Sequence, residues 1–210
     1  MQLSITLIII IITALVSIGG FNNPKIINDL IFYGPAVRQQ NQWYRFFTCG
    51  FIHADWSHLI FNMLSLFFFG PMVEQGFTAL FGDSGKWIYV LFYISALAIS
   101  ILPTYLKQRD NYQYRSLGAS GAVSAVIFAG MMLDPTISIY IFFIPIPIPG
   151  FIFGPLYILI SAYMDRKGGD NINHSAHIWG ALYGLAFVIV ACYAIGYPVI
   201  QNAIEEISGY

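Results

Sequence analysis

Residues 116–123 read SLGASGAV, and they open an apolar stretch that runs on to about Asp134. Two other apolar stretches open with polar residues in the same way. The polar residues of these starts are His53, His58 and Asn62 in one stretch and His177 in the other. A serine between small residues is ordinary by itself. Ser120 stands out because two other apolar stretches also open with polar residues. We expect the three starts to meet inside a membrane.

The composition is typical of an integral membrane protein. Of the 210 residues, 58% are hydrophobic and 9% are charged, whereas a soluble domain carries about 25% charged residues. The mean hydropathy, +0.69, agrees. The net charge of −1 argues against a nucleic-acid partner. Cys49 and Cys192 form no motif, so the sequence predicts no disulfide, no metal site and no cofactor.

Six apolar stretches are candidates for membrane-spanning helices, since a span needs about 20 mostly apolar residues and about 17 can suffice. They are residues 3–21, 57–73, 87–106, 117–133, 150–164 and 175–197. The first lacks a basic start and a cleavage site, so we interpret it as a helix rather than a signal peptide. The fold class is therefore an all-α membrane protein, a six-transmembrane-helix bundle in one domain, residues 1–210.

Two connectors stand out. Residues 22–56 are rich in aromatic side chains, which suits either a segment in the membrane interface or an ordinary ordered loop. Residues 144–150 read IPIPIPG, and their alternating prolines cannot continue a helix. We predict a rigid apolar connector at a membrane face there.

In a six-span chain, helices two, four and six run in the same direction, so their starts lie at one membrane face. His58 and Asn62, four residues apart, share a face of helix two. Ser120 and His177 each lie about one turn into their helices. Helix six also carries small residues at four-residue spacing, namely Ala176, Gly180 and Gly184. Such a ridge allows close helix contact, and helix four is the candidate neighbour.

Hydrolysis of a peptide bond by serine needs a base and donors for the oxyanion. Ser120 and His177 can supply nucleophile and base, and His58, Asn62 and the Ser120 N–H can supply donors. With no acidic residue at the starts of helices four and six, packing alone would orient His177. Structural alternatives exist, because a helix serine often bonds to its preceding turn, and Asn62 could simply join two helices.

Three further residues have expected structural roles. Asp55 is predicted to cap helix two. Glu74 is predicted to make a structural pairing at the opposite face. His174 is predicted to lie solvated in a loop.

These motifs resemble those of the rhomboid intramembrane serine proteases. Gly118 to Gly121 looks like their Gly-x-Ser-Gly motif, and the spacing of His53, His58 and Asn62 resembles their second-helix motif. The set Ala176, His177, Gly180 and Gly184 resembles the sixth-helix motif, while Arg45, Gly70 and Glu74 match further family positions. The resemblance implies a dyad of Ser120 and His177, with His58 and Asn62 at the oxyanion. It also implies cleavage of single-span membrane proteins by a six-helix fold that opens to the extracytoplasmic side.

Two positions depart from the family pattern. A Trp-Arg pair in the first connector reads Tyr44-Arg45 here, with Trp43 one place early. Some members carry a tyrosine four residues after the nucleophile, where it packs on the histidine. This chain has Ser124 there, so the support of His177 is open.

The orientation in the membrane is a point of conflict. Every Lys and Arg except Lys86 falls in an odd-numbered connector, and the positive-inside rule would put those connectors in the cytoplasm. The family topology puts them outside. We follow the family and expect a bacterial inner membrane with the active site on the extracytoplasmic side.

Two other functions remain open. A catalytically inactive relative could bind membrane clients without cutting them. A serine-directed covalent probe would distinguish such a protein from an active protease. A haem- or proton-handling protein could use His53, His58 and His177, and a visible absorbance spectrum would test that.

Overall fold

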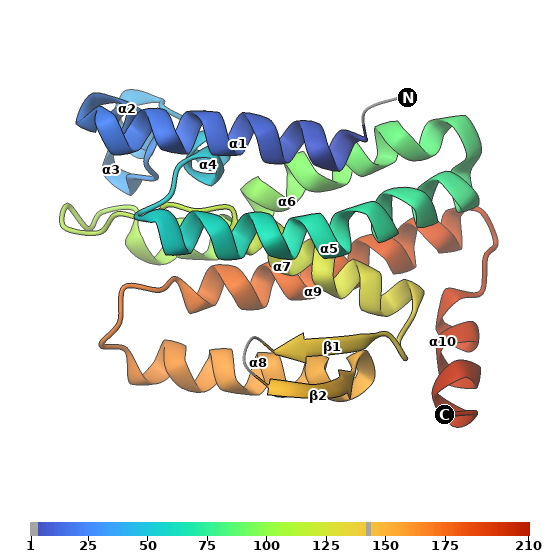
Figure 1. Cartoon of the computed structure of the whole chain (residues 1–210). Coiled ribbons are helices and arrows are strands. Elements are labelled where there is room, and N and C mark those ends of the chain that lie inside the picture. Colours follow the sequence, from blue (N-terminus) through green and yellow to red (C-terminus); the bar gives the residue numbers. More distant parts are fainter. Residues whose placement is uncertain (1–3, 142–143) are drawn as a thin grey trace.

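The computed structural model describes residues 4–141 and 144–210, and most of them are helical. The elements in order are α1 (Ile5–Asn22), α2 (Pro24–Leu30), α3 (Gly34–Gln40), α4 (Arg45–Thr48), η1 (Cys49–Phe51), α5 (Trp56–Phe81), η2 (Gly82–Ser84), α6 (Gly85–Gln108), α7 (Ser120–Leu133), β1 (Ser138–Ile141), β2 (Ile144–Pro149), α8 (Gly150–Lys167), α9 (His174–Ala194) and α10 (Val199–Ser208). Figure 1 shows the six longest helices among them, α1, α5, α6, α7, α8 and α9, aligned along one direction as a bundle.

These six helices correspond to the six predicted stretches. Within the described residues, three helical stretches are long and apolar enough to cross a membrane: Ile5–Asn22, Trp56–Gln108, which contains α5 and α6, and His174–Ala194. The helix Ser120–Leu133 is apolar but shorter. The helical fold class is confirmed, and the number of membrane crossings stays a prediction.

The close packing of α7 against α9 follows from the small residues on both helices. A Cβ atom on Gly180 would lie 2.8 Å from the carbonyl carbon of Gly121 and closer still to its oxygen. One turn further on, a Cβ on Gly184 would lie 2.9 Å from the carbonyl carbon of Ala125. Carbon atoms in ordinary contact are about 3.5–4.0 Å apart, so only glycine fits at both positions. The predicted contact of the helix-six ridge with helix four is confirmed.

The start of α1 is capped by a side chain from α5. Glu74 is 7% exposed, and its carboxylate accepts hydrogen bonds from the Ile5 N–H (2.8 Å), the Thr6 N–H (3.0 Å) and the Thr6 hydroxyl (2.8 Å). A carboxylate at a helix N-terminus satisfies unpaired donors and complements the helix dipole. The structural pairing predicted for Glu74 is confirmed, and α5 runs through Pro71 to Phe81, beyond its predicted end at residue 73.

The first connector is an ordered, packed segment that contains α2, α3, α4 and η1. Its aromatic residues join those of α6 in one cluster, in which Phe46 contacts Phe32, Trp43 and Tyr105. Arg45 is buried there, and it donates to the carbonyls of residues 28 (2.9 Å) and 31 (2.6 Å). The guanidinium therefore holds the connector together from inside.

The connector at residues 144–150 contains a strand that the sequence did not predict. Residues 144–149 form β2, which pairs antiparallel with β1 in a two-stranded hairpin, with Ser138 opposite Pro149 and Ile139 opposite Ile148, and Gly150 begins α8. The helix α10, which was not predicted, runs across the end of the bundle (Figure 1).

The alternating prolines are compatible with a strand because of the edge on which they fall. The Gly150 N–H donates to the Ile137 carbonyl (2.9 Å), so the amide of Gly150 points toward β1. Amide directions alternate along a strand. The N–H of Ile148 therefore points toward β1, and the nitrogens of Pro147 and Pro149 point toward the outer edge. Proline lacks an N–H, so it is tolerated at an outer edge that needs no partner.

Candidate active site

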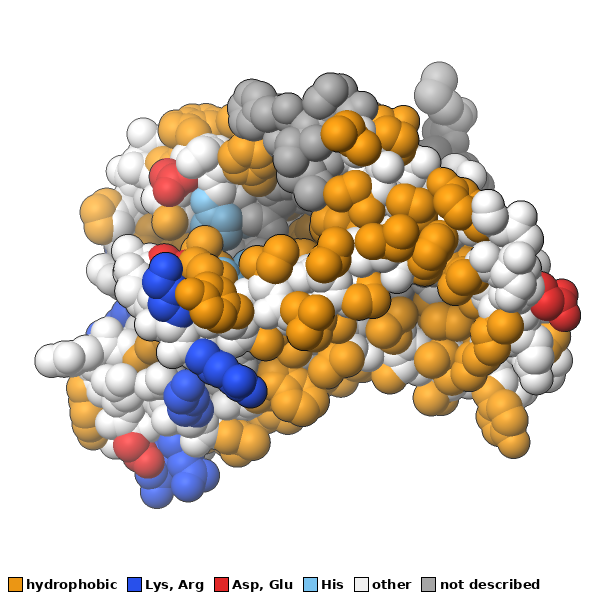
Figure 2. All heavy atoms as spheres, turned by 90° about the horizontal axis from the view of Figure 1, so that it is seen from below, with side chains coloured by type: hydrophobic (Ala, Val, Ile, Leu, Met, Phe, Trp, Pro, Cys, Tyr) orange, Lys and Arg blue, Asp and Glu red, His pale blue; other side chains and the backbone are white. Residues whose placement is uncertain are grey.

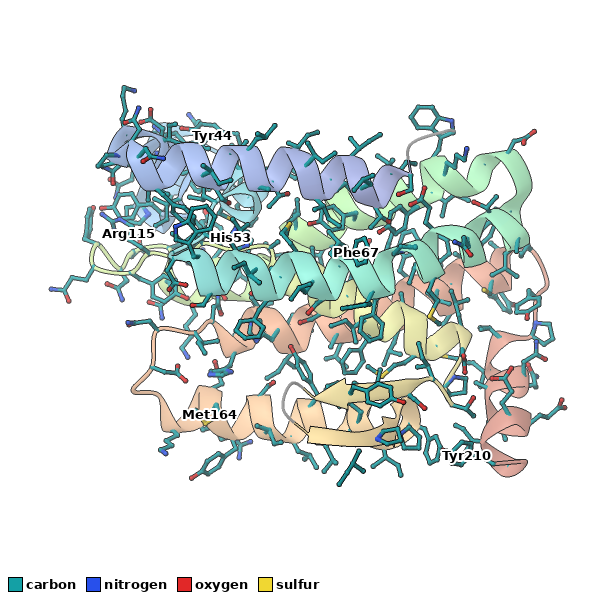
Figure 3. All side chains as sticks on the ribbon, in the orientation of Figure 1. Tyr44, His53, Phe67, Arg115, Met164 and Tyr210 are labelled. Atoms are coloured by element: carbon teal, nitrogen blue, oxygen red, sulfur yellow. The ribbon has the colours of Figure 1, made fainter. Side chains whose placement is uncertain are left out.

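The starts of α5, α7 and α9 lie together at one end of the bundle (Figure 1). Figure 3 shows His53 and Arg115 at this end, while Tyr210 lies at the opposite one. Ser120 is the first residue of α7, and His177 lies in the first turn of α9, whose N-cap is Asn173. The Ser120 Oγ and His177 Nε2 atoms are 2.8 Å apart. The structure thus brings the predicted nucleophile and base into hydrogen-bond contact.

The acidic residue nearest in sequence to His177 bonds to a different histidine. Asp170 Oδ2 lies 2.9 Å from His174 Nε2, and this hydrogen bond holds the pKa of the Asp170 carboxyl below its usual range. The prediction that His174 lies solvated in a loop is wrong, because it is the buried first residue of α9. The His174 ring lies edge-on to the His177 ring at 5.8 Å. Across the part of the chain that the structure describes, no carboxylate hydrogen bonds to His177 itself.

His58 lies against the turn that precedes Ser120. Gly118 has a φ of +113°, a conformation that favours glycine. A Cβ atom on Gly118 would lie 2.6 Å from the His58 Cε1, so the glycine also leaves room for the imidazole. Asp55 caps α5 as predicted, since its carboxylate accepts a hydrogen bond from the His58 N–H (2.8 Å).

Asn62 lies on the same face of α5 as His58, but its side-chain amide does not donate toward Ser120. It is buried, and its amide nitrogen donates to the His58 carbonyl (2.8 Å), a bond within the helix. Among the described residues no direct bond joins Asn62 to Ser120. In this state the side chain braces the turn that carries His58.

His53 connects three segments, a role that the sequence did not reveal. Its Nε2 accepts the Ala119 N–H (3.3 Å), so the Nδ1 carries the proton and donates to Ser17 Oγ (2.9 Å). The Ser17 hydroxyl in turn donates to the Phe51 carbonyl (2.9 Å). Burial, with a smaller effect of nearby His58, lowers the pKa of His53 to about 3, so the ring stays neutral. His53 therefore fixes the backbone next to Ser120 to α1 and the first connector.

A second missed residue is Tyr157 of α8. Its ring is stacked on the His177 ring, with 6.5 Å between centroids and 27° between planes. Its hydroxyl bonds to Ser124 Oγ (2.7 Å), and Ser124 Oγ donates to the Ser120 carbonyl (2.8 Å). The only sequence signal for this contact was Ser124. It stands where some family members carry the tyrosine that packs on the histidine, so another residue had to support His177.

The surface around this end differs from the rest of the molecule. Figure 2 shows the Lys and Arg side chains gathered at this end, where a histidine side chain is visible in a hollow of the surface. Apolar side chains cover most of the length beyond it. A polar, partly open site thus lies at one end of an apolar bundle.

Comparison with known proteins agrees with this architecture. The family profile described as Rhomboid domain matches residues 40–194. RHOMBOID-like protein 12, mitochondrial, of Arabidopsis thaliana is 31% identical over 142 residues, which cover 64% of this chain and 42% of that protein. Putative rhomboid protease YdcA of Bacillus subtilis (strain 168) is 27% identical over 155 residues, covering 71% and 68%. Rhomboid protease GlpG of Enterobacter sp. (strain 638) is 33% identical over 157 residues, covering 73% and 50%.

The chain spans about half the length of several of these curated relatives. The matched region nevertheless contains every candidate site residue, from His53 to His177, and both ends of the contact between α7 and α9. A profile match over residues 40–194 covers well over half of the 210 residues. This chain therefore belongs to the rhomboid family of helical membrane proteins.

Proposed function

We propose that this protein is an intramembrane serine endopeptidase that cuts single-span membrane proteins, with Ser120 as nucleophile and His177 as base. The observation that carries the proposal is the 2.8 Å contact between Ser120 Oγ and His177 Nε2. A base within about 2.6–3.2 Å of the hydroxyl is in reach of the proton it must remove. The names of the relatives YdcA and GlpG support the same class of reaction.

The chemistry follows from this contact. The Ser120 Oγ attacks the carbonyl carbon of the scissile bond while His177 Nε2 takes the hydroxyl proton. His177 then gives that proton to the leaving amine, and the acyl group remains on Ser120. Water hydrolyses the ester in a second step that uses the same base, which restores the free serine.

The negative charge on the attacked oxygen needs donors, and the start of α7 offers them. Because Ser120 is the first residue of the helix, the N–H groups of its first turn have no partner within the helix. The positive end of the helix dipole also lies there. We assign His58 and Asn62 as further donors. His58 lies against the Gly118 turn, and Asn62 would have to release the His58 carbonyl to take part.

We place the protein in a bacterial inner membrane, with the site on the extracytoplasmic side that the family resemblance implies. A substrate helix would have to unwind locally, because a helical peptide bond is shielded from the nucleophile. Small or helix-breaking residues near the cut are therefore expected in substrates, which are membrane-spanning proteins.

The deciding experiment incubates purified protein with a single-span substrate and compares wild type with Ser120→Ala. Cleavage by the wild type alone, together with labelling of Ser120 by a fluorophosphonate, supports the proposal. Equal cleavage by both proteins would refute it, and a wild type that binds substrate without labelling or cleavage would indicate an inactive client binder. A haem protein would show a visible absorbance band, although His53 is poorly suited as a ligand because both of its ring nitrogens are hydrogen-bonded.

A further inference from the structure

We propose that Tyr157 is the positioning residue for His177, so that the geometry of the dyad depends on where α8 is packed. This inference rests on the proposed protease function. In the family that this chain resembles, some members carry a tyrosine four residues after the nucleophile, on the nucleophile's own helix. Here that position is Ser124, and the aromatic ring comes from a different helix.

The contacts form a closed circuit through three helices. Ser120 Oγ bonds to His177 Nε2 (2.8 Å), and His177 stacks on Tyr157 at 27° between ring planes. The Tyr157 hydroxyl donates to Ser124 Oγ (2.7 Å), which donates to the Ser120 carbonyl (2.8 Å). Each member of the circuit limits the freedom of the next, and the circuit begins and ends at the nucleophile.

His177 needs such a support because, among the described residues, its only other ring contact is the edge-on one with His174. In the described part of the chain no carboxylate bonds to the imidazole, and the bond at Nε2 goes to the reacting hydroxyl. A ring stacked on the imidazole face restricts rotation about the Cβ–Cγ bond. Tyr157 is itself held at both ends, by the stack and by Ser124, so it can transmit its position to His177.

The support comes from a loosely enclosed helix. Of the 18 residues of α8, three are buried: Gly150, Gly154 and Ser161. Ten of the 14 residues of α7 are buried by comparison. Helices with few buried residues are displaced at lower free energy. A substrate that moves α8 would therefore also loosen the base, whereas a tyrosine on α7 would not couple the two.

The first test transfers the ring back to α7. Tyr157→Leu should lower the rate of fluorophosphonate labelling, in which Ser120 Oγ displaces fluoride from phosphorus, by about 10- to 100-fold. The same variant should lower kcat with KM unchanged. Tyr157→Phe keeps the stack and should stay within about 5-fold of wild type. Adding Ser124→Tyr to Tyr157→Leu should restore the labelling rate, because the side chain at 124 already reaches the Tyr157 hydroxyl, next to the ring that stacks on His177.

The second test moves α8 without replacing a member of the circuit. A Cβ on Gly154 would lie 3.5 Å from a Phe128 ring carbon, so Gly154→Ala fits and Gly154→Val pushes α8 outward. Gly154→Val should slow labelling about 10-fold in the wild-type background. Gly154→Val should not change the labelling rate when it is added to the double variant Tyr157→Leu, Ser124→Tyr. Gly154→Ala is the matched control and should label at the wild-type rate.

The outcomes separate this inference from the protease proposal. A wild type that neither labels nor cleaves removes the protease function and this inference with it. An active wild type whose Tyr157→Leu variant labels at full rate, with its melting temperature retained, overturns the inference alone. Failure of Ser124→Tyr to rescue a folded Tyr157→Leu protein does the same. If Tyr157→Leu does not fold, Gly154→Val in the wild-type background decides, and a labelling rate equal to that of Gly154→Ala overturns the coupling to α8.

Discussion

Replacement of Gly180 by alanine should remove most of the proposed protease activity, although Gly180 lies outside the proposed dyad of Ser120 and His177. The added Cβ would lie 2.8 Å from the Gly121 carbonyl carbon, and it would be closer to the oxygen. An ordinary contact of about 3.6 Å requires the two backbones to separate by roughly 0.8 Å or more. The 2.8 Å contact between Ser120 and His177 would then lengthen beyond the usual range of a hydrogen bond. A displacement of about 1 Å can reduce a rate about 100-fold, or ~2.7 kcal/mol in activation free energy.

The assay compares initial cleavage rates and melting temperatures of four purified variants with those of the wild type in detergent. Gly180→Ala should lose both activity and stability, and Gly180→Val should be worse. Gly130→Ala is the matched control, because its Cβ would meet the Met72 side chain no closer than 3.6 Å. Val190 lies on the same helix as Gly180 and is 66% exposed, so Val190→Ala should have only a small effect on activity. Wild-type turnover in Gly180→Ala would refute the claim that this glycine contact sets the distance between nucleophile and base.

Three further predictions concern the site. Ser120→Ala and His177→Ala should each abolish cleavage with the fold intact, and the double variant should be no worse than either one; measurable turnover in a single variant would contradict the dyad. Asn62→Ala should lower turnover, by at most about 10²–10³-fold if it donates to the oxyanion; a lower melting temperature with unchanged specific activity would show that it only braces the His58 carbonyl. His53, with its pKa lowered from 6.5 to about 3, should make unfolding easier as the pH falls below 6.5, because the unfolded chain then binds a proton that the folded one does not. The slope should approach ~1.4 kcal/mol per pH unit, and a His53→Gln protein with the same pH dependence would contradict it.

The sequence predicted the position of the site because direction and spacing are simple properties of helices. Helices that alternate in direction bring every second start to one face, and Gly180 and Gly184 at four-residue spacing fall on one side of α9. These two rules were enough to place Ser120 near His177. Neither rule specifies which side chain fills the space beside a ring, so Tyr157 was beyond them. That contact depends on the rotation of α8 about its axis, which three-dimensional packing decides.

The hairpin shows a different limit of sequence reasoning. Prolines in residues 144–150 exclude a helix, and this part of the prediction stands, but exclusion of one structure does not select another. The strand became possible through the pairing partner β1, which leaves the proline nitrogens on the outer edge. The length of α5 was misjudged for a related reason. The predicted end at residue 73 lies just before Glu74, yet Glu74 bonds to the start of α1 while the helix continues to Phe81.

The carboxylate of Glu74 has a consequence for the order in which the chain can assemble. It is separated from the Ile5 N–H that it binds by 69 residues. A ribosome would complete α1 well before it reaches Glu74, so the Ile5 and Thr6 N–H groups lack this acceptor at that moment. They gain one only after α5 has been synthesised and has inserted beside α1. The start of α1 is therefore completed only after α5 is in place, and a chain that stops before residue 74 would leave the Ile5 and Thr6 N–H groups without this acceptor.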